Sequence, residues 1–239
     1  MISVKKLLVY RASFLISLAL MSMWVGAYAT LIEVIFYHTD TLAGWNKGSV
    51  MLVMAYYYLI QNISDIFFKE NFEHFGEVMR RGDLDFRIVK PAPVRLLVFF
   101  WEIRFDHAAG LIPTGLLFFY AFKNLPEALS FSSFLLGLLA SAASVILYFS
   151  ILSFIATLTF WIERNDTFNT LIFNVSQLSR YPRQIYRNTV GKLLTFGIPV
   201  ALIASIPAET ALKFESGSVF FLFSRLFWHY GLRRYTSAT

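Results

Sequence analysis

The chain has 239 residues, of which 57% are hydrophobic and 15% are charged, and its formal net charge is +6. Soluble domains carry about 25% charged residues, so this composition excludes an ordinary water-soluble protein, and no segment is polar and long enough to form a separate soluble domain. The basic residues cluster near the ends of apolar segments, which indicates attraction to anionic lipid headgroups rather than nucleic-acid binding. The absence of cysteine excludes disulfides and thiolate chemistry.

Long stretches without Asp, Glu, Lys or Arg predict helices that cross a membrane. The longest is the 35-residue stretch 128–162, and residues 12–32 and 48–64 are also uncharged. At about 1.5 Å per helical residue, the longest stretch exceeds a hydrocarbon core about 30 Å thick. Backbone polar groups must be hydrogen-bonded within lipid, so such stretches form helices. The sequence therefore predicts an integral membrane protein of the all-α class.

The N-terminus combines the basic residues Lys5, Lys6 and Arg11 with an apolar run and the sequence Ala-Tyr-Ala at 27–29, which imitates a signal-peptide cleavage site. The apolar run is about twenty residues long, which is typical of a spanning helix and too long for a signal core. We therefore predict a retained first helix.

Hydropathy and polar turns predict spans in chain order at 12–36, 48–68, 96–122, 131–161 and 216–232. Lys and Arg gather in the N-terminal tail, in the loop 69–95 and at the C-terminus, whereas the turns 38–48 and 123–130 hold one lysine each. Basic loops stay in the cytoplasm, so both termini are predicted there and the number of crossings is even.

The stretch 163–215 contains two apolar pieces, 167–179 and 193–208, of which only one completes a crossing. In one arrangement 163–192 lies on the cytoplasmic surface and 193–212 crosses, as the basic residues at 180–192 favour. In the other, 164–181 crosses and 182–212 is re-entrant, as Pro199 and Pro207 favour, because proline interrupts a helix. Both arrangements give six spans.

The loop 69–95 holds eleven of the thirty-six charged residues. Its pattern predicts an amphipathic helix over 71–81 with Phe72, Phe75, Val78 and Met79 on one face and Gly82 as its C-terminal cap. A helix resting on lipid headgroups is one interpretation. A docking element for a cytoplasmic partner is the interpretation that we favour.

Three short stretches carry a resemblance to a known family: GDLDFRIVKPAPVRL at 82–96, RYPRQIYRNTVGKLLTFGIPVALIASIPA at 180–208, and GLRRYTSAT at 231–239. In these stretches the chain resembles the ABC-2 type exporter permeases, in particular their small six-helix bacterial branch. The resemblance implies a single permease domain over 1–239 with six transmembrane helices. It also implies an N-terminal interfacial helix at about 1–11, a cytoplasmic coupling helix between helices 2 and 3, and a re-entrant segment between helices 5 and 6.

On this resemblance the fifth span is 164–181 and the re-entrant segment is 182–212, with Tyr181 and Pro182 matching the family's Tyr-Pro and with Pro199 and Pro207 inside the segment. The basic residues at 180–192 depart from this arrangement. The coupling role falls to residues of the loop 69–95: Phe72, Phe75, Met79, Arg80, Arg81, Gly82, Asp83, Leu84, Asp85, Arg87, Lys90 and Pro91.

The resemblance further implies an exporter of the bacterial cytoplasmic membrane whose ATP and Mg are bound by separate ATP-binding cassette subunits. A second permease subunit, either a copy or a sister, would complete the pathway. An alternative from a different class is a non-transporting membrane scaffold that recruits a cytoplasmic partner through the loop 69–95.

Catalytic signatures are missing from the sequence. It has no GxxxxGK[ST] loop, so we expect no ATP hydrolysis and no cofactor on this chain. The four histidines show no HExxH spacing, so no metal site is expected. Asp83-Leu84-Asp85 resembles the DxD of glycosyltransferases, but no soluble domain accompanies it. We predict a transport subunit rather than an enzyme.

Polar residues at membrane depth are the remaining candidates for function. The polar face of the predicted fifth span, with Asn169, Asn174 and Gln177, either packs against protein or borders a wet pathway, and Arg225 lies near the middle of the last span. Glu33, Glu102, Asp106 and Arg225 are interpreted first as members of internal ion pairs or as side chains that extend to the membrane interface, and secondly as substrate contacts. Glu102 and Asp106 are four residues apart, so in one helix they are predicted to share a face.

Overall fold

The computed structural model describes residues 2–91, 93–158, 165–186, 194 and 199–212. Within these residues the regular structure is helical, apart from one isolated bridge between Leu42 and Trp45. Three helices there are long and apolar enough to cross a membrane: α1 (Ile2–His38) over 12–38, α2 (Lys47–Phe67) over 47–67 and α8 (Phe131–Leu158) over 131–157. They coincide with the predicted spans at 12–36, 48–68 and 131–161. The chain is therefore an all-α, multi-pass membrane protein.

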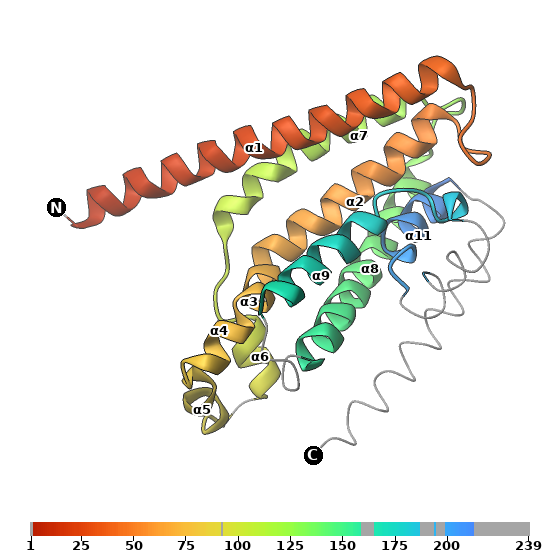
Figure 1. Cartoon of the computed structure of the whole chain (residues 1–239). Helices are drawn as coiled ribbons and strands as arrows, with labels where there is room; N and C mark the ends of the chain where they lie inside the picture. Colours follow the sequence, from red (N-terminus) through yellow and green to blue (C-terminus); the bar gives the residue numbers. More distant parts are fainter. Residues whose placement is uncertain (1, 92, 159–164, 187–193, 195–198, 213–239) are drawn as a thin grey trace.

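Shorter helical elements complete the described fold. They are α3 (Lys69–Glu73), α4 (Phe75–Arg80), α5 (Asp83–Ile88), α6 (Val94–Phe99), η1 (Phe105–Gly110), α7 (Leu111–Lys123), α9 (Asn165–Leu178), η2 (Arg183–Ile185) and α11 (Leu202–Ala211). Helices α4 and α5 form one end of the molecule, and the turn between α1 and α2 lies at the other end (Figure 1).

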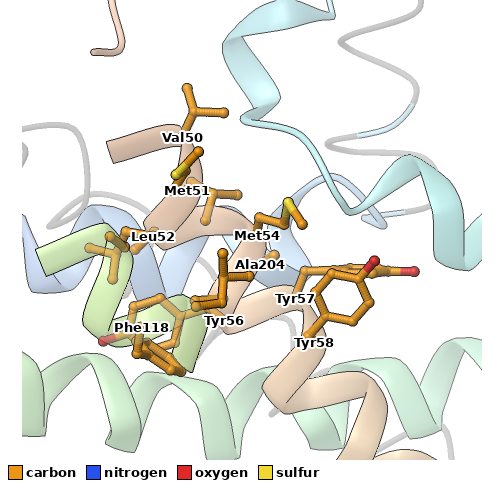
Figure 2. Packing of buried hydrophobic residues seen from close by; sticks show 14 of the residues in the cluster. Val50, Met51, Leu52, Met54, Tyr56, Tyr57, Tyr58, Phe118 and Ala204 are labelled. Atoms are coloured by element: carbon orange, nitrogen blue, oxygen red, sulfur yellow. The ribbon is translucent and has the colours of Figure 1, made fainter. Parts of the chain in front are cut away.

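Helix α2 is the centre of the fold. It lies between α1 and α7 on one side and α8 and α11 on the other (Figure 1). In its most apolar window 78% of the residues are buried, against 11% for α1. Figure 2 shows its core residues, from Val50 to Tyr58, packed with Phe118 of α7 and Ala204 of α11. Helix α2 is therefore covered on most sides, whereas most of α1 is exposed in the single chain.

The start of α2 is set by two residues with different roles. The Asn46 side chain caps the helix by accepting a hydrogen bond from the Ser49 backbone N–H (2.9 Å). Gly48 faces the turn between α7 and α8, where an added Cβ would lie 2.3 Å from the Asn124 carbonyl oxygen. Only glycine allows the two backbones to approach this closely.

The predicted span 96–122 is wrong as a single helix. Helix α6 ends at Phe99, residues 101–104 are not helical, and α7 begins only at Leu111. The backbone N–H of Arg104 donates to the Ile66 carbonyl (2.9 Å), and the Asn71 side chain exchanges two hydrogen bonds with the backbone of Glu102 (2.9 and 3.2 Å). Because these backbone groups bond to the end of α2 and to α3, the helix cannot continue through them.

Two other predicted boundaries differ from the structure. Helix α1 runs without a break through residues 11 and 12, so no separate interfacial helix precedes the first span, since neither Gly nor Pro interrupts residues 2–25. Helix α9 has 14 residues and ends at Leu178, before the predicted limit of 181. The predicted last span 216–232 lies outside the described residues, as do parts of the segment 182–212.

Candidate functional site

The predicted coupling helix over 71–81 is divided into two helices in the structure. Helix α3 ends at Glu73 and α4 begins at Phe75, with His74 capping both. Gly82 follows α4 with a φ of +74°, a left-handed conformation that glycine adopts without strain, and its N–H donates to the Met79 carbonyl (3.1 Å). This turn leads directly into α5. We call residues 69–91 the coupling segment.

The inner side of the coupling segment is held by aromatic rings. Phe72 is 3% exposed and stacks on Phe99 of α6 with ring centroids 3.8 Å apart, while Phe68 and Phe72 both contact Phe149 of α8 (5.2 and 5.4 Å). Phe75 is also buried and lies 5.3 Å from Phe99. We call these five phenylalanines the aromatic anchor. Burial of such rings fastens α3 and α4 to the transmembrane helix α8.

The predicted coupling residues therefore divide into two groups. Phe72 and Phe75 are buried in the aromatic anchor, and Met79 and Leu84 are half-buried against the same cluster. Exposed residues face away from it: Arg80, Arg81, Asp85, Lys90 and Pro91. The inner group holds the segment in place, and only the outer group is accessible to another protein.

Two exposed apolar residues belong to the outer face and were not among the predicted site residues. Phe86 is 73% exposed and Val89 is 80% exposed. They are three residues apart along α5 and its C-terminal cap, so they lie on one side. This spacing within a charged loop is a signal that the sequence offers. The exposed residues of the coupling segment are therefore both apolar and charged.

Two of the predicted coupling residues, Arg87 and the exposed Lys90, also contact Trp101 and so join α5 to the rest of the protein. The Arg87 guanidinium and the Lys90 ammonium each lie 4.8 Å from the ring centre of Trp101, a cation–π arrangement. Arg87 also approaches the Val98 carbonyl (3.5 Å), and Asp83 is half-buried. These contacts close one side of a cleft of about 230 Å³ that Glu70, His74, Glu77, Arg81, Arg87 and Trp101 help to line.

An ionic network connects α3 with α1. The Arg104 guanidinium donates to both carboxylate oxygens of Asp106 (3.1 Å each) and also binds Glu70 of α3. The Ser13 hydroxyl of α1 donates to Asp106 (2.9 Å). We call Glu70, Arg104, Asp106 and Ser13 the ionic network. Glu102, which was predicted to share a face with Asp106, instead bonds through its backbone to Asn71, because the chain is not helical there.

The junction of α2 and α3 is also ionic. Lys69 forms an ion pair with Asp65 (2.8 Å). Burial alone would lower the pKa of Lys69, but the neighbouring Asp65 carboxylate raises it above its usual range, so Lys69 stays charged. Burial raises the pKa of Glu73. In the described part of the chain no group of His, Asp and Glu is arranged to hold a metal ion.

The structure describes the side chains of two of the four predicted pathway residues, Asn174 and Gln177. Helix α9 buries the face that carries Ile172 and Ser176, whereas Asn174 is exposed and Gln177 is half-buried. Asn169 belongs to α9, and Arg225 lies outside the described residues. The buried Ser176 hydroxyl is hydrogen-bonded to Tyr148 of α8. The polar character of α9 thus serves packing on this face.

The start of the predicted re-entrant segment packs against α11. The Arg183 Nε donates to Glu209 (2.8 Å), the Gln184 amide donates to the same oxygen (2.7 Å), and the Arg183 N–H donates to Ser205 Oγ (3.0 Å). Glu209 is 1% exposed. Tyr181 and Pro199 are half-buried, while Pro182 and Pro207 are buried. One of the basic residues that opposed the re-entrant arrangement therefore has a carboxylate partner inside the protein.

Comparison with known proteins adds one finding. Residues 22–239, a range that includes the whole coupling segment, match the family model described as ABC-2 family transporter protein. No curated protein matches the chain. No solved structure matches it either.

Proposed function

Because the chain belongs to the ABC-2 transporter family and is a multi-pass membrane protein, it is a permease component of an ABC transporter, and we propose that it is the permease of an exporter. In this proposal, separate cassette ATPases dock on the coupling segment and hydrolyse ATP. A second permease subunit completes the pathway, and cargo leaves across the bacterial cytoplasmic membrane. Both chain termini are then cytoplasmic, with the coupling segment on the same side.

The observation that carries this proposal is the two-sided build of the coupling segment. Its exposed residues include the apolar Phe86 and Val89 as well as Arg80 and Arg81, and protein interfaces combine exposed apolar anchors with charged residues. Its inner face is the aromatic anchor on α6 and α8. A force applied to the outer face is therefore passed to a transmembrane helix rather than absorbed by a loose loop.

The ionic network offers a second route for that force. Glu70 lies in α3, Arg104 and Asp106 lie before and within η1, and Ser13 lies in α1. A displacement of α3 pulls on Arg104 through Glu70 and on α1 through Asp106. We propose that nucleotide-driven closure of the ATPase pair tilts α1 and α8 by these two routes and exposes the pathway alternately to each side of the membrane.

Co-purification tests the proposal. The permease is co-expressed with a candidate cassette ATPase from the same genome, and stoichiometry and ATP turnover are measured in vesicles. The double variant Phe86→Asp/Val89→Asp places charges on the outer face and should lose the ATPase. The matched control Tyr37→Asp changes an 87% exposed aromatic residue at the opposite end of the molecule and should retain it.

Each outcome is decisive. One-to-one binding of the ATPase to the parent chain and to Tyr37→Asp, but not to the double variant, supports docking on the coupling segment. Unchanged binding and stimulated turnover in the double variant would refute it. Binding of a cytoplasmic protein without ATP-dependent cargo movement would favour the scaffold alternative.

A further inference from the structure

Arg180 is a buried cation surrounded by tyrosines. Its side chain is 6% exposed, and its guanidinium carbon lies 3.5 Å from the ring centre of Tyr28, 5.0 Å from that of Tyr57 and 5.9 Å from that of Tyr58. One terminal nitrogen donates to the Tyr57 hydroxyl (3.4 Å). We call the three tyrosines with Arg180 the tyrosine cage. It joins α1 and α2 to the end of α9.

The tyrosine cage lies at the middle of α2, one of the helices long and apolar enough to span a membrane. Tyr57 is the central residue of α2, which runs from Lys47 to Phe67, and Figure 2 shows the Tyr57 and Tyr58 rings side by side. An ionisable side chain at this depth is costly and points to a functional site. Phosphates of resident lipids lie roughly 15 Å away, at half the core thickness, so a headgroup of the resting bilayer does not reach it.

The positive charge of Arg180 is surrounded by tyrosine rings and has no carboxylate partner in the described structure. Among the described residues no carboxylate lies within ion-pair distance of it, whereas Arg183, three residues later, has Glu209 at 2.8 Å. Tyrosine faces attract a cation through their quadrupole without cancelling its charge. Two donors are also without an acceptor in the described structure, the Nε–H of Arg180 and the Tyr58 hydroxyl. A net positive charge with spare donors is the chemistry that binds an anion.

We propose that the tyrosine cage recognises the anionic group, a phosphate monoester or a carboxylate, of an amphiphilic cargo molecule as it crosses the membrane. This rests on the proposed transport function and adds a substrate class to it. The Arg180 guanidinium supplies the charge, and Tyr58 supplies a second hydrogen bond. The acyl or aryl part of the cargo remains among the apolar side chains of α1 and α2. Tyr28 belongs to α1, most of which is exposed in the single chain, so a small displacement of α1 opens the cage toward lipid.

Thermal unfolding of the full-length permease in neutral detergent tests this proposal with defined probes. Dodecyl phosphate should raise the unfolding midpoint in a saturable manner, because a ligand that binds only the folded state stabilises it. Dodecyltrimethylammonium, which has the same alkyl chain and the opposite charge, should not raise the unfolding midpoint. Inorganic phosphate should not raise it either, since it lacks the apolar part. Arg180→Met should abolish the shift, and Arg80→Gln, which removes an equal charge from the outer face, should retain it.

Tyr58→Phe keeps the ring and removes a hydroxyl that has no hydrogen-bond partner among the described residues, so the unliganded protein should be as stable as the parent. Its affinity for dodecyl phosphate should fall about tenfold, the effect of one hydrogen bond to a charged group. An unchanged affinity in Tyr58→Phe, an equal shift in Arg180→Met or a preference for the cationic probe would overturn the proposal.

The assay contains no ATPase, so its outcome is independent of docking. Phe86→Asp/Val89→Asp should keep the dodecyl phosphate shift even where it loses the ATPase. If dodecyl phosphate did not raise the unfolding midpoint of the parent chain while the ATPase still docked on it, the anion-site proposal would be refuted. The transport proposal would be unaffected.

Discussion

The coupling-segment end of the molecule and the interior of the helix bundle hold their arginines differently. At the coupling-segment end Arg104 is held by two carboxylates, Glu70 and Asp106. Inside the bundle Arg183 has Glu209, whereas the partners of Arg180 among the described residues are tyrosines. A paired arginine stabilises the contact between the elements that it joins, whereas an unpaired one costs stability and points to a ligand. Four substitutions test this difference.

The largest effect is expected for Glu209→Gln. The substitution removes the charged partner from the ion pair between Glu209 and the half-buried Arg183, and removing one member of a buried pair costs about 3–5 kcal/mol. We expect a large drop in the free energy of unfolding, measured by denaturation in detergent. Lys47→Gln is the control, because its pair with Glu33 is partly exposed and contributes about 0–1 kcal/mol. Equal losses in the free energy of unfolding in the two variants would contradict the larger contribution expected of the more buried ion pair.

Phe72→Ala should follow, with a loss of about 3–4 kcal/mol, because it removes a buried ring from the aromatic anchor. Phe86→Ala removes the same side chain from the exposed outer face of the coupling segment and should change stability by less than about 0.5 kcal/mol. The same denaturation measurement separates the two. A comparable loss in Phe86→Ala would show that the outer face is covered by the protein itself.

Arg104→Gln should have an intermediate effect, about 1–2 kcal/mol, because the guanidinium is partly exposed and solvent replaces some of its contacts. In the complete transporter we expect ATP turnover to persist while cargo movement falls, since α3 and α1 lose their connection. Arg81→Gln, exposed on the outer face, should leave that connection intact. Full cargo movement in Arg104→Gln would remove the ionic network from the coupling route.

Arg180→Met should have the smallest effect on stability, within about 1 kcal/mol of the parent, because an apolar residue of similar length replaces a buried charge that has no carboxylate among the described residues. Loss of the cation–π contacts lowers the stability of the variant, whereas removal of a buried charge relieves a desolvation cost, so the two effects oppose each other. A loss as large as that of Glu209→Gln would show that Arg180 is a structural residue, and the anion site would lose its support.

Much of the membrane architecture could be predicted from the sequence. The uncharged stretches at 12–32 and 48–64 and at 128–162 correspond to α1, α2 and α8. The left-handed turn at Gly82 was also predictable, since glycine after a basic last turn is a common helix end. The break at 100–110 was not predictable, because the hydrogen bonds that cause it join Glu102 and Arg104 to residues 31 and 38 positions earlier.

The candidate site, too, could be predicted from the sequence only in part. The charge density of residues 69–95 singled out the coupling segment, but its amphipathic pattern did not tell which side faces inward. The apolar residues Phe72 and Phe75 are buried, and the equally apolar Phe86 and Val89 are exposed. The aromatic residues on α6 and α8 determine which side of the segment is buried, and they lie outside the segment, so its own sequence pattern does not reveal them.

The apolar stretches of the sequence are enough to predict that the chain crosses a membrane as helices, because lipid offers no hydrogen-bond partners to a backbone that is not helical. The sequence also shows which loop carries the charge. The pairing of the arginines depends on the fold, since Arg180 and Arg183 are three residues apart in the chain and differ in the groups that α1, α2 and α11 bring beside them. The electrostatic state of a buried cation depends on groups that folding brings within a few ångströms, and that proximity is a property of the fold.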